Sequence, residues 1–146
     1  MIALLFLALV AADPPAAPPV TIDGLPIGGL PRQSLPATGC AAYLFSAGQT
    51  RALVAMASAE PASLRLSLDG RVVDLGRTTA SGAVNFGFGT STEYRASDVT
   101  ATLDMTTRSR KDLTQGAVVD SGTLRIDRAG KDTIVLPVGG LIGCAT

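Results

Sequence analysis

Hydrophobic and polar residues alternate most regularly along residues 63–75. Three leucines alternate with polar residues before Asp69-Gly70, which is the period of a half-buried strand. The Asp-Gly dipeptide suits a two-residue type I′ turn, because both central residues of that turn need a positive φ. A turn of this kind fixes the register and places Arg65 opposite Asp74, an ion pair across the strands. The predicted hairpin pairs Leu68 with Arg71, Leu66 with Val73 and Leu64 with Leu75.

The same alternation predicts further short strands joined by turns, and no helical period persists along the chain. Residues 83–89 alternate Val84, Phe86 and Phe88 with small residues, which predicts a fifth strand. Residues 90–97 are predicted to be a polar connection. The eight predicted strands are residues 40–45, 51–58, 63–68, 71–75, 83–89, 99–105, 117–126 and 133–142.

Eight short strands in sequence favour an all-β fold, an antiparallel eight-stranded meander. The two cysteines, Cys40 and Cys144, bracket these strands. A disulfide between them brings the first and last strands together, as closure of a barrel requires. We therefore prefer a closed barrel over a two-sheet sandwich, although a sandwich with adjacent terminal strands would also permit the bridge.

The residues before the first cysteine divide into two segments. Residues 1–12 combine an unbroken apolar run with small residues at a cleavage position, which predicts a signal peptide, with a short uncleaved anchor as the alternative. Residues 13–39 hold seven of the nine prolines and are predicted to be a Pro-rich linker or disordered arm. Their apolar part, residues 22–30, could instead lie against the folded domain. That domain is predicted to span residues 40–146.

An even number of cysteines behind a signal peptide indicates a disulfide rather than a redox pair or a two-thiolate metal site. In the chain-entropy model, a bridge closing a loop of this length stabilises the fold by up to about 4–5 kcal/mol. We therefore expect a periplasmic or secreted protein.

The composition argues against several functions. The chain has no histidine, which removes a Ser-His-Asp triad and the commonest metal ligand. Twelve basic residues balance twelve acidic ones, so charge does not favour a nucleic-acid partner. The glutamates Glu60 and Glu93 are expected on the surface, and Gly87-Phe88-Gly89 lacks the lysine and helix of a phosphate loop. We expect no catalysis, no cofactor and no metal.

Two loop clusters remain as candidate binding residues. Arg108, Arg110 and Lys111 form a local excess of positive charge that could grip an anionic polymer, a lipid headgroup or an acidic partner. The alternative is a solvated loop whose charge is offset by Asp104 and Asp112. Tyr94 and Arg95 are a second candidate, because aromatic and arginine side chains dominate binding hot spots. Tyr94 could equally be part of the core.

These residues favour a non-catalytic, monomeric binding module of the bacterial cell envelope, acting on a protein partner through exposed loops. Ser81-Gly82-Ala83 distantly resembles the Ser-Gly-Ala motif of the periplasmic inhibitors of c-type lysozyme, although the residues that follow it and the expected lysine differ. This resemblance implies an inhibitor. The alternatives are a carrier of a small apolar ligand inside the barrel, and a structural envelope component.

Overall fold

The computed structural model describes residues 11–146, so most of the predicted signal peptide lies outside the described residues. The described part contains nine strands and no helix. The strands are β1 (Ile27–Gly28), β2 (Cys40–Ser46), β3 (Leu53–Ala59), β4 (Ala62–Leu68), β5 (Arg71–Ser81), β6 (Ser91–Ala96), β7 (Val99–Arg108), β8 (Gly116–Arg128) and β9 (Ile134–Cys144).

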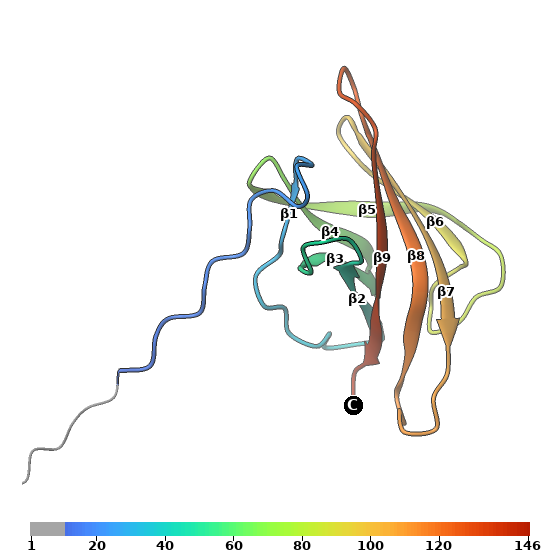
Figure 1. The fold of residues 1–146 in the computed structure, drawn as a ribbon. Helices are drawn as coiled ribbons and strands as arrows, with labels where there is room; N and C mark the ends of the chain where they lie inside the picture. Colours follow the sequence, from blue (N-terminus) through green and yellow to red (C-terminus); the bar gives the residue numbers. More distant parts are fainter. Residues whose placement is uncertain (1–10) are drawn as a thin grey trace, which may run out of the picture.

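Strands β2 to β9 form a closed antiparallel barrel (Figure 1). Each strand pairs with its neighbours in sequence, and β2 also pairs with β9. The short β1 is an extra strand that pairs with Ser67 and Leu68 of β4, just after the last β4 residue that pairs with β3. The prediction of an eight-stranded closed barrel is confirmed.

The β4–β5 hairpin has the predicted register at every position. Asp69 and Gly70 have φ values of 50° and 79°, as a type I′ turn requires. Leu64 lies opposite Leu75, and Arg65 lies opposite Asp74. The guanidinium of Arg65 donates from Nε to Asp74 Oδ1 at 2.8 Å and from Nη2 to Oδ2 at 3.2 Å.

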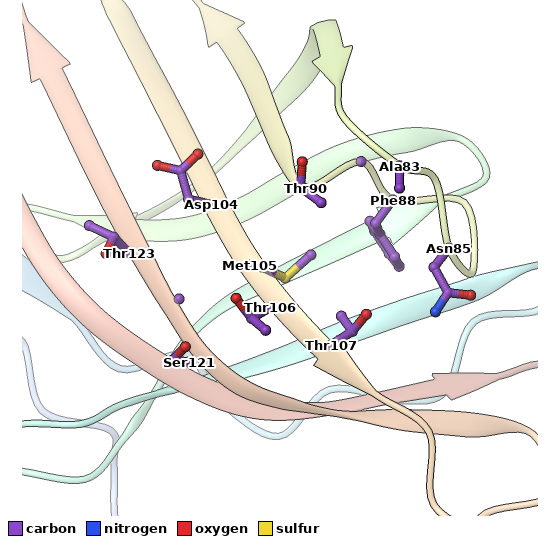
Figure 2. Close-up of a pocket in the computed structure, with 12 residues that line it drawn as sticks. Ala83, Asn85, Phe88, Thr90, Asp104, Met105, Thr106, Thr107, Ser121 and Thr123 are labelled. Carbon is purple, nitrogen blue, oxygen red and sulfur yellow. The ribbon is translucent and has the colours of Figure 1, made fainter.

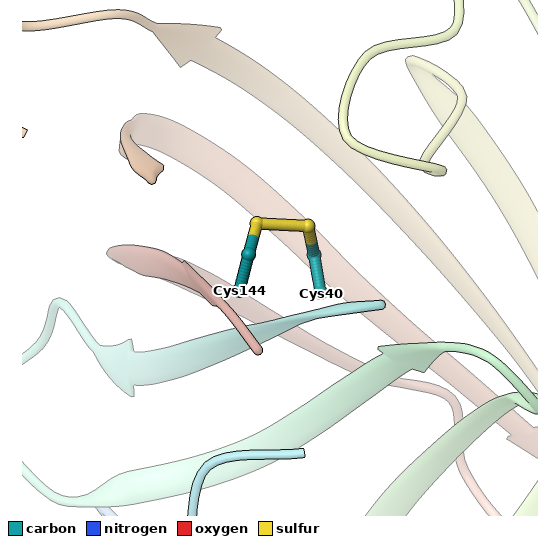
Figure 3. Close-up of a disulfide and its surroundings, with 2 residues drawn as sticks. All are labelled: Cys40 and Cys144. Atoms are coloured by element: carbon teal, nitrogen blue, oxygen red, sulfur yellow. A yellow bond between two sulfur atoms is a disulfide. The ribbon is translucent and has the colours of Figure 1, made fainter. Parts of the chain in front are cut away.

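A disulfide joins the first and last strands of the barrel, as predicted. Cys40 and Cys144 lie directly opposite each other on β2 and β9, with an S–S distance of 2.03 Å (Figure 3). The two cysteines are 104 residues apart in the sequence, so the bridge ties together the ends of the barrel's meander. We call this end of the barrel the disulfide end.

Two local predictions between β5 and β7 are wrong. Residues 83–89 form the connection between β5 and β6, with only an isolated bridge between Asn85 and Phe88. Gly82, Phe86 and Gly87 have φ values of 81°, 54° and 86°, which a regular strand does not allow. Residues 90–97, predicted to be a polar connection, instead contain β6.

The interior of the barrel is filled by side chains from every barrel strand. The burial pattern alternates along the strands, as in β7, where Ala101, Leu103 and Met105 are buried. The largest fully buried side chains include Tyr94, Leu44, Leu64, Leu66, Leu75, Leu103, Leu124 and Ile126.

The apolar part of the Pro-rich segment packs against the barrel, the possibility that the sequence left open. Ile22 and Ile27 are fully buried in the main core cluster. Asp23 accepts a hydrogen bond at 3.1 Å from the backbone N–H of Thr50, in the β2–β3 turn. This segment therefore covers the barrel end opposite the disulfide, which we call the capped end (Figure 1).

Within residues 11–146, no helix is long and apolar enough to cross a membrane. The disulfide is consistent with a periplasmic or extracellular protein.

Candidate functional site

The outer face of β2, β8 and β9 carries a contiguous set of apolar residues. Along these strands one set of side chains enters the core and the alternate set faces outward. Tyr43 lies opposite Leu141, Phe45 lies opposite Gly139, and Val118 also lies opposite Leu141. We call this surface the apolar wall, defined as Tyr43, Phe45, Val118, Pro137, Gly139 and Leu141.

The apolar wall is accessible to solvent at Phe45 and Leu141. Phe45 is 43% exposed and Leu141 is 51% exposed. Gly139 adds no side chain between them, so the wall combines bulky side chains with bare backbone. An adjoining set of apolar residues of this kind is more typical of a binding surface than scattered exposed side chains are.

The Pro-rich segment borders the apolar wall. The hydroxyl of Tyr43 donates to the backbone carbonyl of Ser34 at 2.8 Å, and partial burial raises the pKa of this phenol. The side chain of Arg65 donates to Gln33 at 2.8 Å, and Leu30 N donates to Leu53 O at 2.6 Å. These contacts hold residues 30–34 along the barrel and leave Leu35 exposed beside the wall.

Three hollows adjoin the apolar wall. Two of them, of about 480 and 530 Å³, lie along the Pro-rich segment and share Tyr43 and Leu141. The third, of about 550 Å³, lies beside Phe45 and Gly139, where a β-bulge in β8 interrupts the pairing with β9. The wall therefore offers recesses for apolar side chains on both sides of its central residues.

A separate, polar hollow of about 540 Å³ lies between β7, β8 and the β5–β6 connection (Figure 2). Asp104 is the only charged residue in its lining within residues 11–146. Phe88 is almost fully buried there and offers no open ring face for stacking. The remaining polar lining side chains are Asn85, Thr90, Thr106, Thr107, Ser121 and Thr123.

The predicted basic cluster is largely neutralised by neighbouring aspartates. Arg108 makes two hydrogen bonds to Asp120, both at 2.9 Å, and this pairing lowers the pKa of the Asp120 carboxyl. Arg110 makes two bonds to Asp112, at 2.9 and 2.8 Å. This arrangement agrees with the solvated-loop alternative, except that Asp120 rather than Asp104 pairs with Arg108. Lys111 is left as the remaining cation of the cluster.

The second predicted cluster does not form a surface site. Tyr94 is only 1% exposed and belongs to the core cluster, which corrects its assignment as a binding residue. Its register partner on β7 is the small Ala101, which leaves room for the ring inside the barrel. Arg95 points outward and pairs with Glu93 at 2.9 Å.

The two predicted clusters also lie far apart on the barrel. Arg108, Arg110 and Lys111 lie at the disulfide end, where Cys144 N donates to Gln115 O. Arg95 lies opposite Thr100, near the capped end. The structure therefore does not bring the predicted binding residues together.

Sequence reasoning missed the apolar wall. The local sequence signal for the wall is that residues 41–45 are apolar at every position. A strand with one solvent-exposed face normally alternates apolar and polar residues. The wall itself depends on the pairing of β2 with β9, which are about a hundred residues apart in the sequence.

Among residues 11–146, no group of three or more histidine, cysteine, aspartate or glutamate residues is arranged to hold a metal ion. No family model, curated protein or solved structure matches this chain.

Proposed function

We propose that this chain is an exported, non-catalytic binding module that docks a protein partner through the apolar wall. The observation that carries the proposal is the contiguous exposure of Phe45, Leu141 and the apolar residues beside them. Monomeric soluble proteins rarely expose large adjoining apolar patches unless the patch binds something.

The composition of the wall suits a protein partner. Tyr43 and Phe45 are aromatic anchors of the kind that dominate protein–protein hot spots. Arg32, Gln33 and Arg51 line the adjoining hollows and provide a polar rim. Because a closed barrel has no free strand edge, a partner would pack side chains into the hollows rather than add a strand.

The alternative of an internal carrier has less support, because buried side chains fill the barrel. A lysozyme inhibitor keeps one supporting observation: Ser81, Gly82 and Ala83 are exposed where β5 ends. An inhibition assay with c-type lysozyme tests that specific partner. Inhibition that survives changes in the apolar wall would move the functional site to the β5–β6 connection.

Photo-crosslinking in the source cells tests the proposed docking face. A photo-reactive amino acid replaces Leu141 in the wall or, as a matched control, Val72, which is 52% exposed on β5. We expect Leu141 to yield a discrete crosslinked protein and Val72 to yield none. Identical products from the two positions, or none from Leu141, would contradict the proposal.

A double substitution, Phe45→Ser with Leu141→Ser, tests the energetic role of the wall. The substitutions remove two apolar anchors that the partner would bury in the complex, so binding of the crosslinked partner should weaken by about 2 kcal/mol or more. Folding should change little, because exposed positions usually contribute within about 0.5 kcal/mol. Calorimetric binding and urea unfolding of the same variant separate the two effects.

A further inference from the structure

Arg128 is buried at the capped end of the barrel. It follows Leu124 and Ile126 on the inward-facing side of β8, and its side chain is only 9% exposed. Its Nη1 donates to Asp69 Oδ2 at 2.5 Å. Asp69 belongs to the β4–β5 turn, so this bridge crosses the end of the barrel from β8 to the far wall.

The Nε of Arg128 has no hydrogen-bond partner among the described residues and is closed to solvent. A buried donor without a partner costs free energy, so a missing acceptor is a significant feature. Five of the more exposed arginines differ in this respect, because each donates from Nε to a carboxylate. These arginines are Arg65, Arg95, Arg108, Arg110 and Arg125.

A hollow of about 340 Å³ lies beside Arg128. Lys131, from the β8–β9 hairpin, provides a second cation in its lining. The lining also contains the carboxylates of Asp69, which is engaged by Arg128, and Asp132. Thr133 and Ile134 also line the hollow, and the rest of its wall is the Gly24–Pro26 turn, which belongs to no strand of the barrel.

We propose that this hollow is a binding site for a small oxyanion, a carboxylate or a phosphate. Two oxygens of such a group match the paired donors along one edge of a guanidinium. The anion would bind the Nε edge of Arg128 and gain a second charge contact from Lys131. Because Nε is closed to solvent, the lining of the hollow would have to shift for the anion to reach it.

This site is separate from the apolar wall, since the two share no lining residue. An anion bound here would hold the N-terminal segment to β8 and to the β4–β5 turn. The proposal therefore does not depend on the proposed protein partner.

NMR titration of the disulfide-intact protein tests the site directly. The probes are acetate, succinate and inorganic phosphate, each compared with chloride at matched ionic strength. We expect a saturable shift of the Arg128 Nε–Hε signal, with shifts of the amides of residues 23–26 and 131–134. Saturation by acetate or succinate alone identifies a carboxylate site, and saturation by phosphate alone identifies a phosphate site. No saturable shift beyond that of chloride would overturn the proposal.

Two substitutions check the geometry. Lys131→Gln removes an exposed charge and should weaken binding about tenfold, the equivalent of one charge-assisted contact. Lys111→Gln removes the same charge from the β7–β8 loop at the disulfide end, away from the hollow, and should leave the affinity unchanged. Equal weakening by both would show a nonspecific charge effect and overturn the site. Lys131 is substituted rather than Arg128 because the Arg128 side chain is largely buried and its removal could prevent folding.

Discussion

Tyr94 places a phenol inside the barrel, where burial raises its pKa to about 12. The nearby Thr92 hydroxyl and the charge of Arg77 oppose this shift, but burial has the larger effect. The ionised phenol is disfavoured in the core because a buried charge loses its hydration.

This pKa predicts a loss of stability at alkaline pH. The folded state holds the Tyr94 proton more tightly than the unfolded chain, whose phenol has a pKa near 10. The contribution of the protonated phenol to the free energy of unfolding is therefore fully present below about pH 10. It is lost progressively as the pH rises toward 12, and the total loss is about 2–3 kcal/mol. Urea unfolding of Tyr94→Phe across this pH range should show a smaller loss than the unaltered protein. Parallel curves for the two proteins would contradict this assignment.

The β4–β5 hairpin shows how a local sequence determines an element. Asp69-Gly70 adopts the left-handed conformation at both positions, and the register of the six residue pairs between β4 and β5 follows from that turn. Gly70 has the φ value of 79° that a side chain disfavours, while an added Cβ would meet only Val20 Cγ1, at the ordinary van der Waals distance of 3.6 Å.

Substitution of Gly70 should therefore act through backbone strain. We expect Gly70→Ala to destabilise the protein by about 1–2 kcal/mol, the cost of a left-handed conformation for an L-residue. Gly76→Ala on β5 is the matched control, because its neighbourhood is open and its φ is not positive. That control should be neutral or slightly stabilising. Equal effects in urea unfolding would exclude turn strain as the cause.

Other elements could not be predicted from their own residues. β6 is mostly polar in sequence, with Tyr94 as its one large core side chain, and its place in the sheet depends on pairing with β5 and β7 on both sides. The aromatic alternation of residues 83–89 resembles a strand, but Phe86 and Gly87 adopt positive φ values that end it. In both cases the tertiary surroundings outweigh the local pattern.

The closed barrel was predictable because its evidence was distributed along the whole chain. Alternation, tight turns and two bracketing cysteines all agreed on the same topology. The candidate site was not predictable in this way. The apolar wall and the Arg128 hollow form only when segments distant in sequence meet, and the charged loop residues proved to be paired with aspartates.

Because the Cys40–Cys144 disulfide closes the barrel, we expect the stability of the folded protein to depend strongly on it. Replacement of both cysteines by alanine should lower the free energy of unfolding by about 2–4 kcal/mol, because the bridge constrains a long loop in the unfolded chain. Urea unfolding of the double variant measures this change. A reduction below about 0.5 kcal/mol would show that the strand pairing of β2 with β9 is sufficient without the bridge.

Native mass spectrometry of the protein recovered from its own cells, without reductant, tests the binding role most directly. We expect a disulfide-intact chain in complex with another protein, and we expect the Phe45→Ser, Leu141→Ser variant to be recovered without that partner. A stoichiometric small apolar adduct on an otherwise free chain would contradict docking through the apolar wall and would favour a carrier.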